Sequence, residues 1–259
     1  MSNTRDIYRG LSPFQRKPLG GISSSALRII ALFLMLLDHA WATIIPGNNW
    51  MTYMGRLAFP IFAFQITEGF LHTSDRRQYA RRLFVFGLIS EIPFNYMVAA
   101  SPIYPFHQNV MFTLLLGLRA MEGIEMLRQA RTWKTLIQCL LRLAGCLFLS
   151  AITFVDYGVM GVMTVLLFYI FRGFPFAWIG QLAGMALLHI IFFKGYTLVI
   201  PLFGYTLSLP AQSFAVLSLL IIWVYNGKKG KGGKYLQLGS YCFYPLHMIL
   251  LYLLAVLTQ

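Results

Sequence analysis

Long apolar runs separated by short polar segments dominate the pattern of this sequence. About nine runs can be drawn, each near the length that an α-helix needs to cross a bilayer. They cover approximately residues 26–45, 50–70, 82–98, 109–127, 135–154, 157–171, 175–193, 209–225 and 236–257. The apolar and aromatic segment 194–208 is the exception. It is broken by Gly195, Pro201 and Gly204, which predicts a re-entrant or interfacial element and leaves about eight to ten spans open. We therefore expect an all-α, polytopic bundle of transmembrane helices.

The composition supports the same class. Of the 259 residues, 58% are hydrophobic and 11% are charged, whereas soluble globular chains carry about 25% charged residues. The mean hydropathy is +0.66. Residues 1–25 form a polar, basic tail, and the first apolar run lacks a small-residue cleavage site, so we expect a retained span and a single membrane domain over 26–259.

The positive charges predict the orientation. The net charge is +13, and the basic residues gather in the tail and in the even-numbered loops. This alternation follows the positive-inside rule, so membrane lipids explain the charge and nucleic acid is not needed as a partner. The pattern places the N-terminus in the cytoplasm and, for nine spans, the C-terminus outside. No internal repeat is visible, which gives an inverted-repeat transporter no support.

One pair of polar residues interrupts the first apolar run. Asp38 and His39 lie roughly 15 Å beyond the charged start of that run, at 1.5 Å of rise per residue. A charge at this depth costs about 2.5–3.5 kcal/mol on insertion scales, so the pair is a candidate functional site. His39 titrates near pH 7. Neighbouring helical side chains point about 100° apart, so we expect Glu91 or Asp156, and not Asp38, to orient the His39 ring.

Other polar residues in the apolar runs share one depth range, from mid-membrane to the outer face. They are Arg56, Glu91, His107, Gln108, Asn109, Asp156, Tyr157 and His247. Side chains of this kind at one level predict a common cavity.

Several of these residues also have a purely structural interpretation. Arg56 pairs with Asp38 or Glu91 in that case. Glu91 precedes Pro93 and either lines a cavity or braces a bend. In the structural interpretation, His247 is a buried histidine that only forms hydrogen bonds, and Asp156 is the N-cap of the sixth span.

The loop after the second run, HTSDRRQYARR, carries four arginines, Arg76, Arg77, Arg81 and Arg82. They either follow the positive-inside rule with contacts to anionic lipid or form a phosphate site, because guanidinium groups match phosphate oxygens. Glu68, near the inner end of the second run, is a candidate partner for one of them.

Six blocks of the sequence resemble the TraX family. They are LLDHAW, GRLAFPIFAFQITEGF, HTSDRRQYARRLFVFGLISEIPFN, HQNVMFTLLLGL, DYGVMGV and YCFYPLHMILL, and they run in the family's order from residue 27 onward. The resemblance implies an integral membrane acyltransferase. The founding member is associated with N-acetylation of conjugative pilin. The family is grouped with membrane acyltransferases that include the bacterial O-antigen acetylases and the lysosomal heparan glucosaminide acetyltransferase. Such enzymes are thought to take acetyl-CoA from the cytoplasm and acylate a peptide or glycan on the opposite side.

The resemblance places His39 where that set keeps a catalytic histidine. We expect His39 to act as general base or to form an acyl-histidine. Around it, the candidate catalytic residues are Asp38, Glu91 and His247, and the candidate substrate or oxyanion residues are Arg56, His107, Asn109, Asp156 and Tyr244. The loop arginines would hold the phosphates of acetyl-CoA. The histidines come from separate runs without metal-ligand spacing, so no metal is expected.

Two other functions are open. In a proton-coupled transporter, Asp38, Glu91 and the histidines form a proton relay. In a non-catalytic assembly factor, the same bundle only holds partners. The acceptor and any oligomeric state are open as well.

Overall fold

The structure is a computed structural model that describes residues 21–193, 197–202 and 205–258. Most of the basic tail expected over 1–25 lies outside the described residues. The described part is almost entirely helical. Its elements are α2 (Ser24–Thr43), α3 (Asn49–Gly55), α4 (Ala58–His72), α5 (Arg76–Ala99), α6 (Val110–Ala130), α7 (Trp133–Ile152), α8 (Gly158–Ile170), α9 (Ala177–Ala186), the π-helix η1 (Leu187–Phe192), β1 (Thr197–Leu202), β2 (Tyr205–Pro210), the 3-10 helix η2 (Ala211–Leu217), α10 (Ser218–Trp223) and α11 (Gly233–Thr258).

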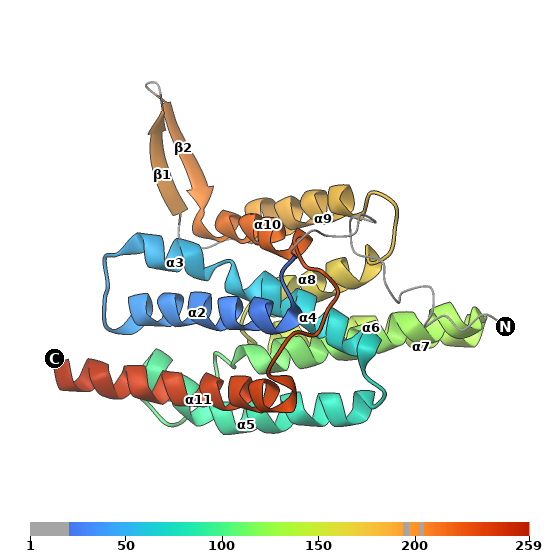
Figure 1. The fold of residues 1–259 in the computed structure, drawn as a ribbon, viewed down its shortest axis with the longest axis horizontal. Coiled ribbons are helices and arrows are strands. Elements are labelled where there is room, and N and C mark those ends of the chain that lie inside the picture. The colour runs from blue at the N-terminus through green and yellow to red at the C-terminus, as the bar shows by residue number, and fades with distance from the viewer. Residues whose placement is uncertain (1–20, 194–196, 203–204, 259) are drawn as a thin grey trace.

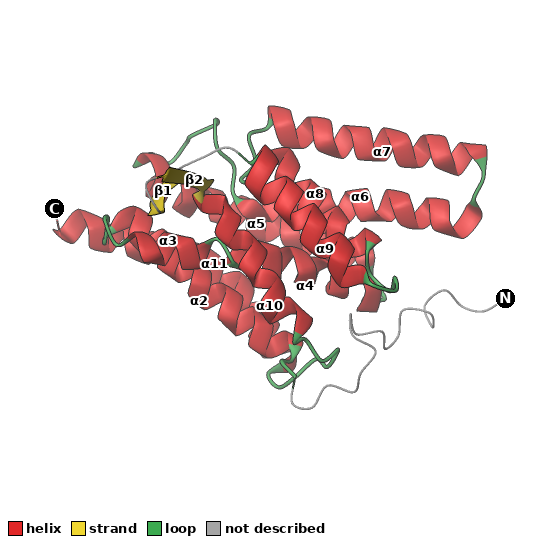
Figure 2. Ribbon diagram, turned by 90° about the horizontal axis from the view of Figure 1, so that it is seen from above, coloured by secondary structure: helices red, strands yellow, loops and turns green. Residues whose placement is uncertain are grey.

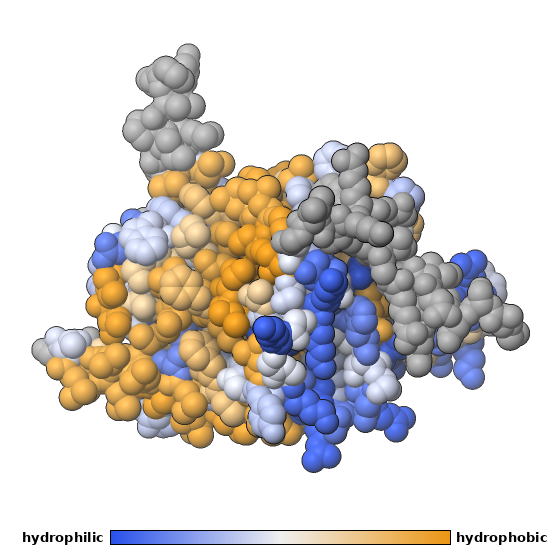
Figure 3. Space-filling view, in the orientation of Figure 1, coloured by the Kyte–Doolittle hydropathy of each residue, from blue (hydrophilic) through white to orange (hydrophobic). Residues whose placement is uncertain are grey.

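The long helices form a bundle whose two ends differ in character. In Figure 1 the start of α2 and the α4–α5, α6–α7 and α8–α9 connections lie at one end, and the α2–α3 turn and the end of α11 lie at the other. Figure 2 shows α7 at the margin of the bundle, beside α6. Figure 3 shows an apolar surface over much of the viewed face, with a hydrophilic band where α11 begins. The basic connections therefore share one end, as the alternation of charge predicts, and we call this the inner end.

Three described helices are long and apolar enough to cross a membrane: α2, α7 and α11. Three shorter apolar segments, 158–170, 177–192 and 211–223, accompany them. These features are those of a membrane protein. The nine spans expected from the sequence are more than the three helices that length and composition support.

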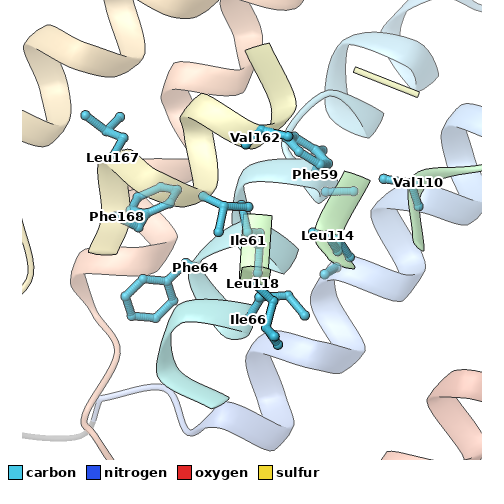
Figure 4. Close-up of a cluster of buried hydrophobic side chains, with 14 of the residues drawn as sticks. Phe59, Ile61, Phe64, Ile66, Val110, Leu114, Leu118, Val162, Leu167 and Phe168 are labelled. Carbon is cyan, nitrogen blue, oxygen red and sulfur yellow. The ribbon is translucent and has the colours of Figure 1, made fainter. Parts of the chain in front are cut away.

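The apolar core lies where α4 packs between α6 and α8. Phe59, Ile61 and Phe64 of α4 are at most 2% exposed, and Figure 4 shows them beside side chains of α6 and α8. Glycines let α6 and α8 approach closely, because a Cβ on Gly117 would lie 2.8 Å from Cβ of Val165. This core fixes the starts of α6 and α8, which carry several candidate site residues.

The second expected span, 50–70, is broken into α3 and α4 at Arg56 and Leu57. Pro60 has no N–H to donate to the Arg56 carbonyl, so a single helix loses a bond there, whereas proline is tolerated in the first turn of α4. Gly55, the last residue of α3, packs on α2, where a Cβ would meet Cβ of Asp38 at 2.3 Å. The break therefore brings the end of α3 against Asp38.

The all-α expectation is wrong for residues 197–210. Here β1 and β2 pair antiparallel, from Thr197 opposite Pro210 to Leu202 opposite Tyr205, and the hairpin projects from the bundle (Figure 1). Apolar runs of this length do not distinguish a strand from a helix, but the β-branched residues of β1 favour a strand. The seventh and eighth expected spans are also interrupted: α9 continues as the π-helix η1, and the 3-10 helix η2 precedes α10.

Candidate functional site

An ion pair joins α2 to α3 at the outer end of the bundle. Nη2 of Arg56 lies 2.9 Å from Oδ1 of Asp38, and the Thr52 hydroxyl donates to the same oxygen at 2.6 Å. Arg56 also donates to the Thr52 hydroxyl oxygen. The expected pairing of Arg56 is thereby confirmed for Asp38, and Thr52 is a member that the sequence did not indicate. Asp38 is committed to α3 and does not orient His39.

His39 and His247 share a hydrogen bond between α2 and α11. Nδ1 of His39 lies 2.7 Å from Nε2 of His247, and the two rings are nearly parallel. The other nitrogen of His247, Nδ1, lies 2.8 Å from the Phe243 carbonyl oxygen. The expectation that Glu91 or Asp156 orients the His39 ring is therefore wrong, because His247, 4% exposed, does so.

These contacts assign the tautomers of the pair. A carbonyl only accepts, so Nδ1 of His247 carries its proton, and Nε2 of a neutral His247 offers a lone pair. His39 then donates from Nδ1, which leaves a lone pair on its own Nε2. No hydrogen-bond partner for that nitrogen occurs among the described residues. His39 is thus held by one nitrogen and presents the other as a base or nucleophile.

Asp156 and His107 face each other across the start of α8. Oδ1 of Asp156 lies 3.5 Å from Nε2 of His107. A short β-bridge fixes both, since the Gln108 amide donates to the Phe154 carbonyl and the Asp156 amide donates to the Gln108 carbonyl. The Asp156 carboxylate raises the pKa of His107 above its ordinary value.

The expectation that Asp156 is the N-cap of the sixth span is wrong. Tyr157 occupies that position, with φ of 62°, and Asp156 instead accepts a hydrogen bond from the Tyr157 amide at 3.0 Å. The Thr113 hydroxyl of α6 donates to the Asp156 carbonyl oxygen. Asp156 is therefore held by its backbone while its carboxylate faces the site.

Glu91 and Asn109 brace the joint between α5 and α6. The Asn109 amide nitrogen Nδ2 donates to Oε2 of Glu91 at 2.5 Å and to the Gly87 carbonyl at 2.8 Å. Asn109 is also the N-cap of α6, where its Oδ1 accepts from the Met111 amide. Both N–H groups of the Asn109 side chain are used in this brace, which argues against its expected role as an oxyanion donor. Oε1 of Glu91 is buried and has no hydrogen-bond partner among the described residues.

A cavity runs between five helices from the inner end toward the histidine pair. Water molecules can occupy about 80 Å³ of it, and part of it is open to the surroundings. At its inner end lie Arg28, Tyr79 and Gln237, and at its outer end lie Val110 and Tyr244. Arg28, Leu32 and Met35 line it from α2, and their spacing puts them on the same face of the helix as His39.

Tyr244 separates this cavity from the histidines. The side chain is 3% exposed, lines the cavity and has its ring centroid 5.8 Å from that of His247.

The four loop arginines have different surroundings. Arg76 lies over the Phe70 ring and 3.8 Å from Glu125, whereas Arg77 and Arg81 are exposed. Arg82 lies over the ring of Tyr79, which lines the inner end of the cavity. The structure thus brings only Arg82 of the four beside the cavity.

Glu68 does not pair with any of these arginines, contrary to expectation. It forms a buried ion pair with Arg172, which follows α8, with Nε of Arg172 at 2.6 Å from Oε1 of Glu68. The two are 104 positions apart in the sequence. The pair ties the ends of α4 and α8 together at the inner end.

His189, in the π-helix η1, is a histidine that the sequence pattern did not single out. It is fully buried, and its two ring nitrogens lie at hydrogen-bond distance from the Thr164 hydroxyl and the Gln212 amide. Both nitrogens are satisfied, so His189 joins η1 to α8 and η2 and is not available for chemistry. Among the described residues, no group of three or more histidine, cysteine or acidic side chains is arranged to hold a metal ion.

A family model and two known proteins match this chain. The family model described as TraX protein matches residues 23–255. The chain is 31% identical over 245 residues to the probable fimbrial assembly protein FimC, serogroup H1, of Dichelobacter nodosus, covering 88% of this chain and 94% of that protein. It is 28% identical over 146 residues to Protein TraX of Escherichia coli, covering 55% of this chain and 54% of that protein. No solved structure matches the chain. Because the family model matches most of its length, the chain belongs to the TraX family.

Proposed function

We propose that this protein is an integral membrane acyltransferase that moves an acetyl group from CoA to an amine or hydroxyl at the outer side of the membrane. The observation that carries the proposal is the His39 ring, which His247 holds at Nδ1 and whose Nε2 has no hydrogen-bond partner among the described residues. An internal cavity leads from the basic inner end toward this pair. The association of the TraX family with pilin acetylation supports the same reaction.

In the proposed reaction, Nε2 of His39 takes the proton of the acceptor N–H or O–H group as that group attacks the thioester carbonyl carbon. The tetrahedral intermediate then expels the CoA sulfur, the C–S bond breaks, and the proton on His39 passes to the leaving thiolate. The hydrogen bond that Nδ1 of His39 donates to His247 stabilises the transient imidazolium. An acyl-histidine route uses the same Nε2 lone pair as nucleophile.

The oxyanion needs a hydrogen-bond donor close to His39. Arg56 is one candidate, because its guanidinium group is charged and its side chain is 26% exposed. His107 and Tyr244 are the alternatives. Glu91 supports the site as a brace to Asn109.

The rise of α2 from Arg28 to His39 is close to the length of an extended pantetheine arm. Eleven residues of helix place His39 about 16 Å beyond Arg28. The arm has the backbone length of roughly four extended residues, about 15 Å. With the nucleotide at Arg28 and Arg82, the thioester would reach the level of Tyr244 and His247. The Tyr244 ring must turn aside for the thioester carbon to meet His39.

The proposal includes the membrane arrangement. The chain would lie in the bacterial cytoplasmic membrane as a multi-pass protein with its basic end inward. The shorter and more polar helices would complete about nine crossings beside α2, α7 and α11. Acetyl-CoA, membrane lipids and an acceptor peptide or glycan are the partners, and an oligomer is compatible with this arrangement.

The test compares envelope components from cells with and without the protein by mass spectrometry. We expect one component to gain an acetyl group only when the protein is present. The gain should disappear with His39→Ala at equal membrane abundance. An identical spectrum in both cells would overturn the proposal.

An assembly factor is the second candidate, because one relative is named a probable fimbrial assembly protein. Purified protein in proteoliposomes separates the candidates. A transferase releases CoA thiol, a proton-coupled transporter conducts protons without CoA, and an assembly factor does neither.

A further inference from the structure

A glycine- and lysine-rich loop, NGKKGKGGK, connects α10 to α11 at residues 226–234. Its four lysines, Lys228, Lys229, Lys231 and Lys234, are exposed. No carboxylate among the described residues lies within ion-pair distance of any of them. The positive-inside rule explains the positive charge of this loop, but it does not require the loop to have a fixed position.

The loop is fixed to the start of α2 by hydrogen bonds. The amides of Ser24 and Ser25 donate to the carbonyls of Lys228 and Lys229 at 2.9 and 3.0 Å, and the Ser25 hydroxyl also donates to the Lys229 carbonyl. The Asn226 side chain donates to the Gly21 carbonyl at 2.6 Å. The loop thus has a defined place at the inner end of α2.

That place adjoins the mouth of the cavity. The Ser24 carbonyl accepts a hydrogen bond at 2.8 Å from Gln65, whose side chain lines the cavity. At the other end of the loop, Gln237 and Ser240 line the cavity from the first turns of α11. Arg28, which also lines the cavity, lies one turn above Ser24. Both ends of the loop therefore lie beside residues that line the inner end of the cavity.

Gly230 keeps the lysines close to this mouth. Its φ is 80°, and a Cβ there would lie 2.3 Å from Oγ of Ser23. Only glycine fits both the backbone conformation and the contact. The backbone on either side of Gly230 thereby lies against the start of α2.

Charge balance points to a polyanionic ligand. Arg28 and Arg82 supply two positive charges at the mouth. The head of CoA carries a diphosphate and a 3′-phosphate, and a phosphate monoester alone has about −1.5 to −2 charges. We propose that the loop 226–234 holds the phosphates of the CoA donor over the inner mouth of the cavity. This inference rests on the proposed transferase function and adds the site of the nucleotide end.

Binding of CoA to the purified full-length protein in bilayers of zwitterionic lipid tests the assignment. The loop variant is Lys228→Gln, Lys229→Gln, Lys231→Gln and Lys234→Gln together. The matched control is Arg131→Gln with Lys134→Gln, which removes exposed charge from the α6–α7 connection at the same end. We expect the loop variant to raise the Kd for CoA by about tenfold or more and the control to leave it within about twofold. For dephospho-CoA, which lacks the 3′-phosphate, the loop variant should raise the Kd by a smaller factor.

The outcomes separate this inference from the function on which it rests. Wild-type protein that binds no CoA overturns both. Equal CoA binding by wild type and loop variant overturns only the role of the loop. If the loop variant binds CoA more weakly than wild type in anionic bilayers but equally well in zwitterionic ones, the lysines act on lipid head groups. That result also overturns the inference. Transfer activity of the loop variant should recover at saturating acetyl-CoA, since the histidine pair is unchanged.

Discussion

At the scale of residues, the site depends on which hydrogen bonds each polar side chain forms. Asp38 is bonded to Arg56 and Thr52, Asn109 to Glu91, and His247 to the Phe243 carbonyl and His39. After these bonds are assigned, the lone pair on Nε2 of His39 is left over. A basic nitrogen without a hydrogen-bond partner among the described residues, close to the outer end of a cavity, is what general-base catalysis needs.

The ion pair between α2 and α3 gives the first prediction. Replacing Asp38 by Asn leaves the Arg56 charge without its anion. We expect a loss of about 1–3 kcal/mol in the free energy of unfolding, because the pair is partly and not fully desolvated. Arg56→Gln should cost a similar amount, and the double variant less than the sum. Thermal or denaturant unfolding in detergent measures this, and additive losses would contradict the pairing.

His107 and Asp156 give a prediction about pH. The carboxylate raises the pKa of His107 in the folded protein, so this contact stabilises the fold fully below the ordinary histidine pKa of about 6.5. The contribution is lost as pH rises through the higher folded pKa. His107 is more than a third exposed, so we expect a modest effect.

The measurement is the melting temperature of wild type and His107→Gln as a function of pH. The difference should be larger near pH 6 than near pH 9. Asp156→Asn should remove this dependence. A difference between wild type and His107→Gln that is the same at both pH values would contradict the contact.

At the scale of elements, close helix contacts place the site residues. The start of α6 carries Asn109 as its cap and the start of α8 follows Asp156, and the two helices meet through Gly117 and Gly161. We expect Gly117→Ala to cost about 1–3 kcal/mol, because its Cβ would overlap with Val165. Gly145→Ala on α7 is the control, since a Cβ there meets nothing within 4 Å, and it should be neutral or stabilising. Equal effects of the two variants on unfolding would contradict this view of the α6–α8 contact.

The sequence predicts elements well where a local pattern suffices. The positions of the helices near 24–43, 110–130 and 133–152 follow from apolar run length, and the shared end of the basic connections follows from charge alternation. The pairing of Arg56 with Asp38 was predictable because the two are only 18 positions apart and few charges share that depth.

Other features depend on tertiary contacts that no local pattern reveals. His39 and His247 are 208 positions apart, and Glu68 and Arg172 are 104 apart. The segment 194–208 was predicted to be a re-entrant or interfacial element and not a hairpin, because short apolar runs do not distinguish a strand from a helix. The break between α3 and α4 was open to prediction from Pro60, which ends the bonding of a preceding helix.

At the scale of the whole molecule, the account requires a path for the donor through the bundle. A large side chain in the cavity should block this path. We expect Ser240→Trp, which places an indole in the cavity, to raise the KM for acetyl-CoA by about tenfold or to abolish transfer. Leu238→Trp is the matched control on α11, since Leu238 is 56% exposed. Equal transfer kinetics for the two variants, with both proteins folded, would show that the donor does not use this cavity.

The most direct measurement is the rate of acetyl transfer by purified protein in proteoliposomes, for wild type, His39→Gln, His247→Gln and His72→Gln. His72, exposed at the inner end of α4, is the control. The account predicts a loss of about 100-fold or more for His39→Gln, a smaller loss for His247→Gln and no change for His72→Gln. A His39→Gln protein that binds CoA like wild type and transfers acetyl groups at the full rate would contradict it.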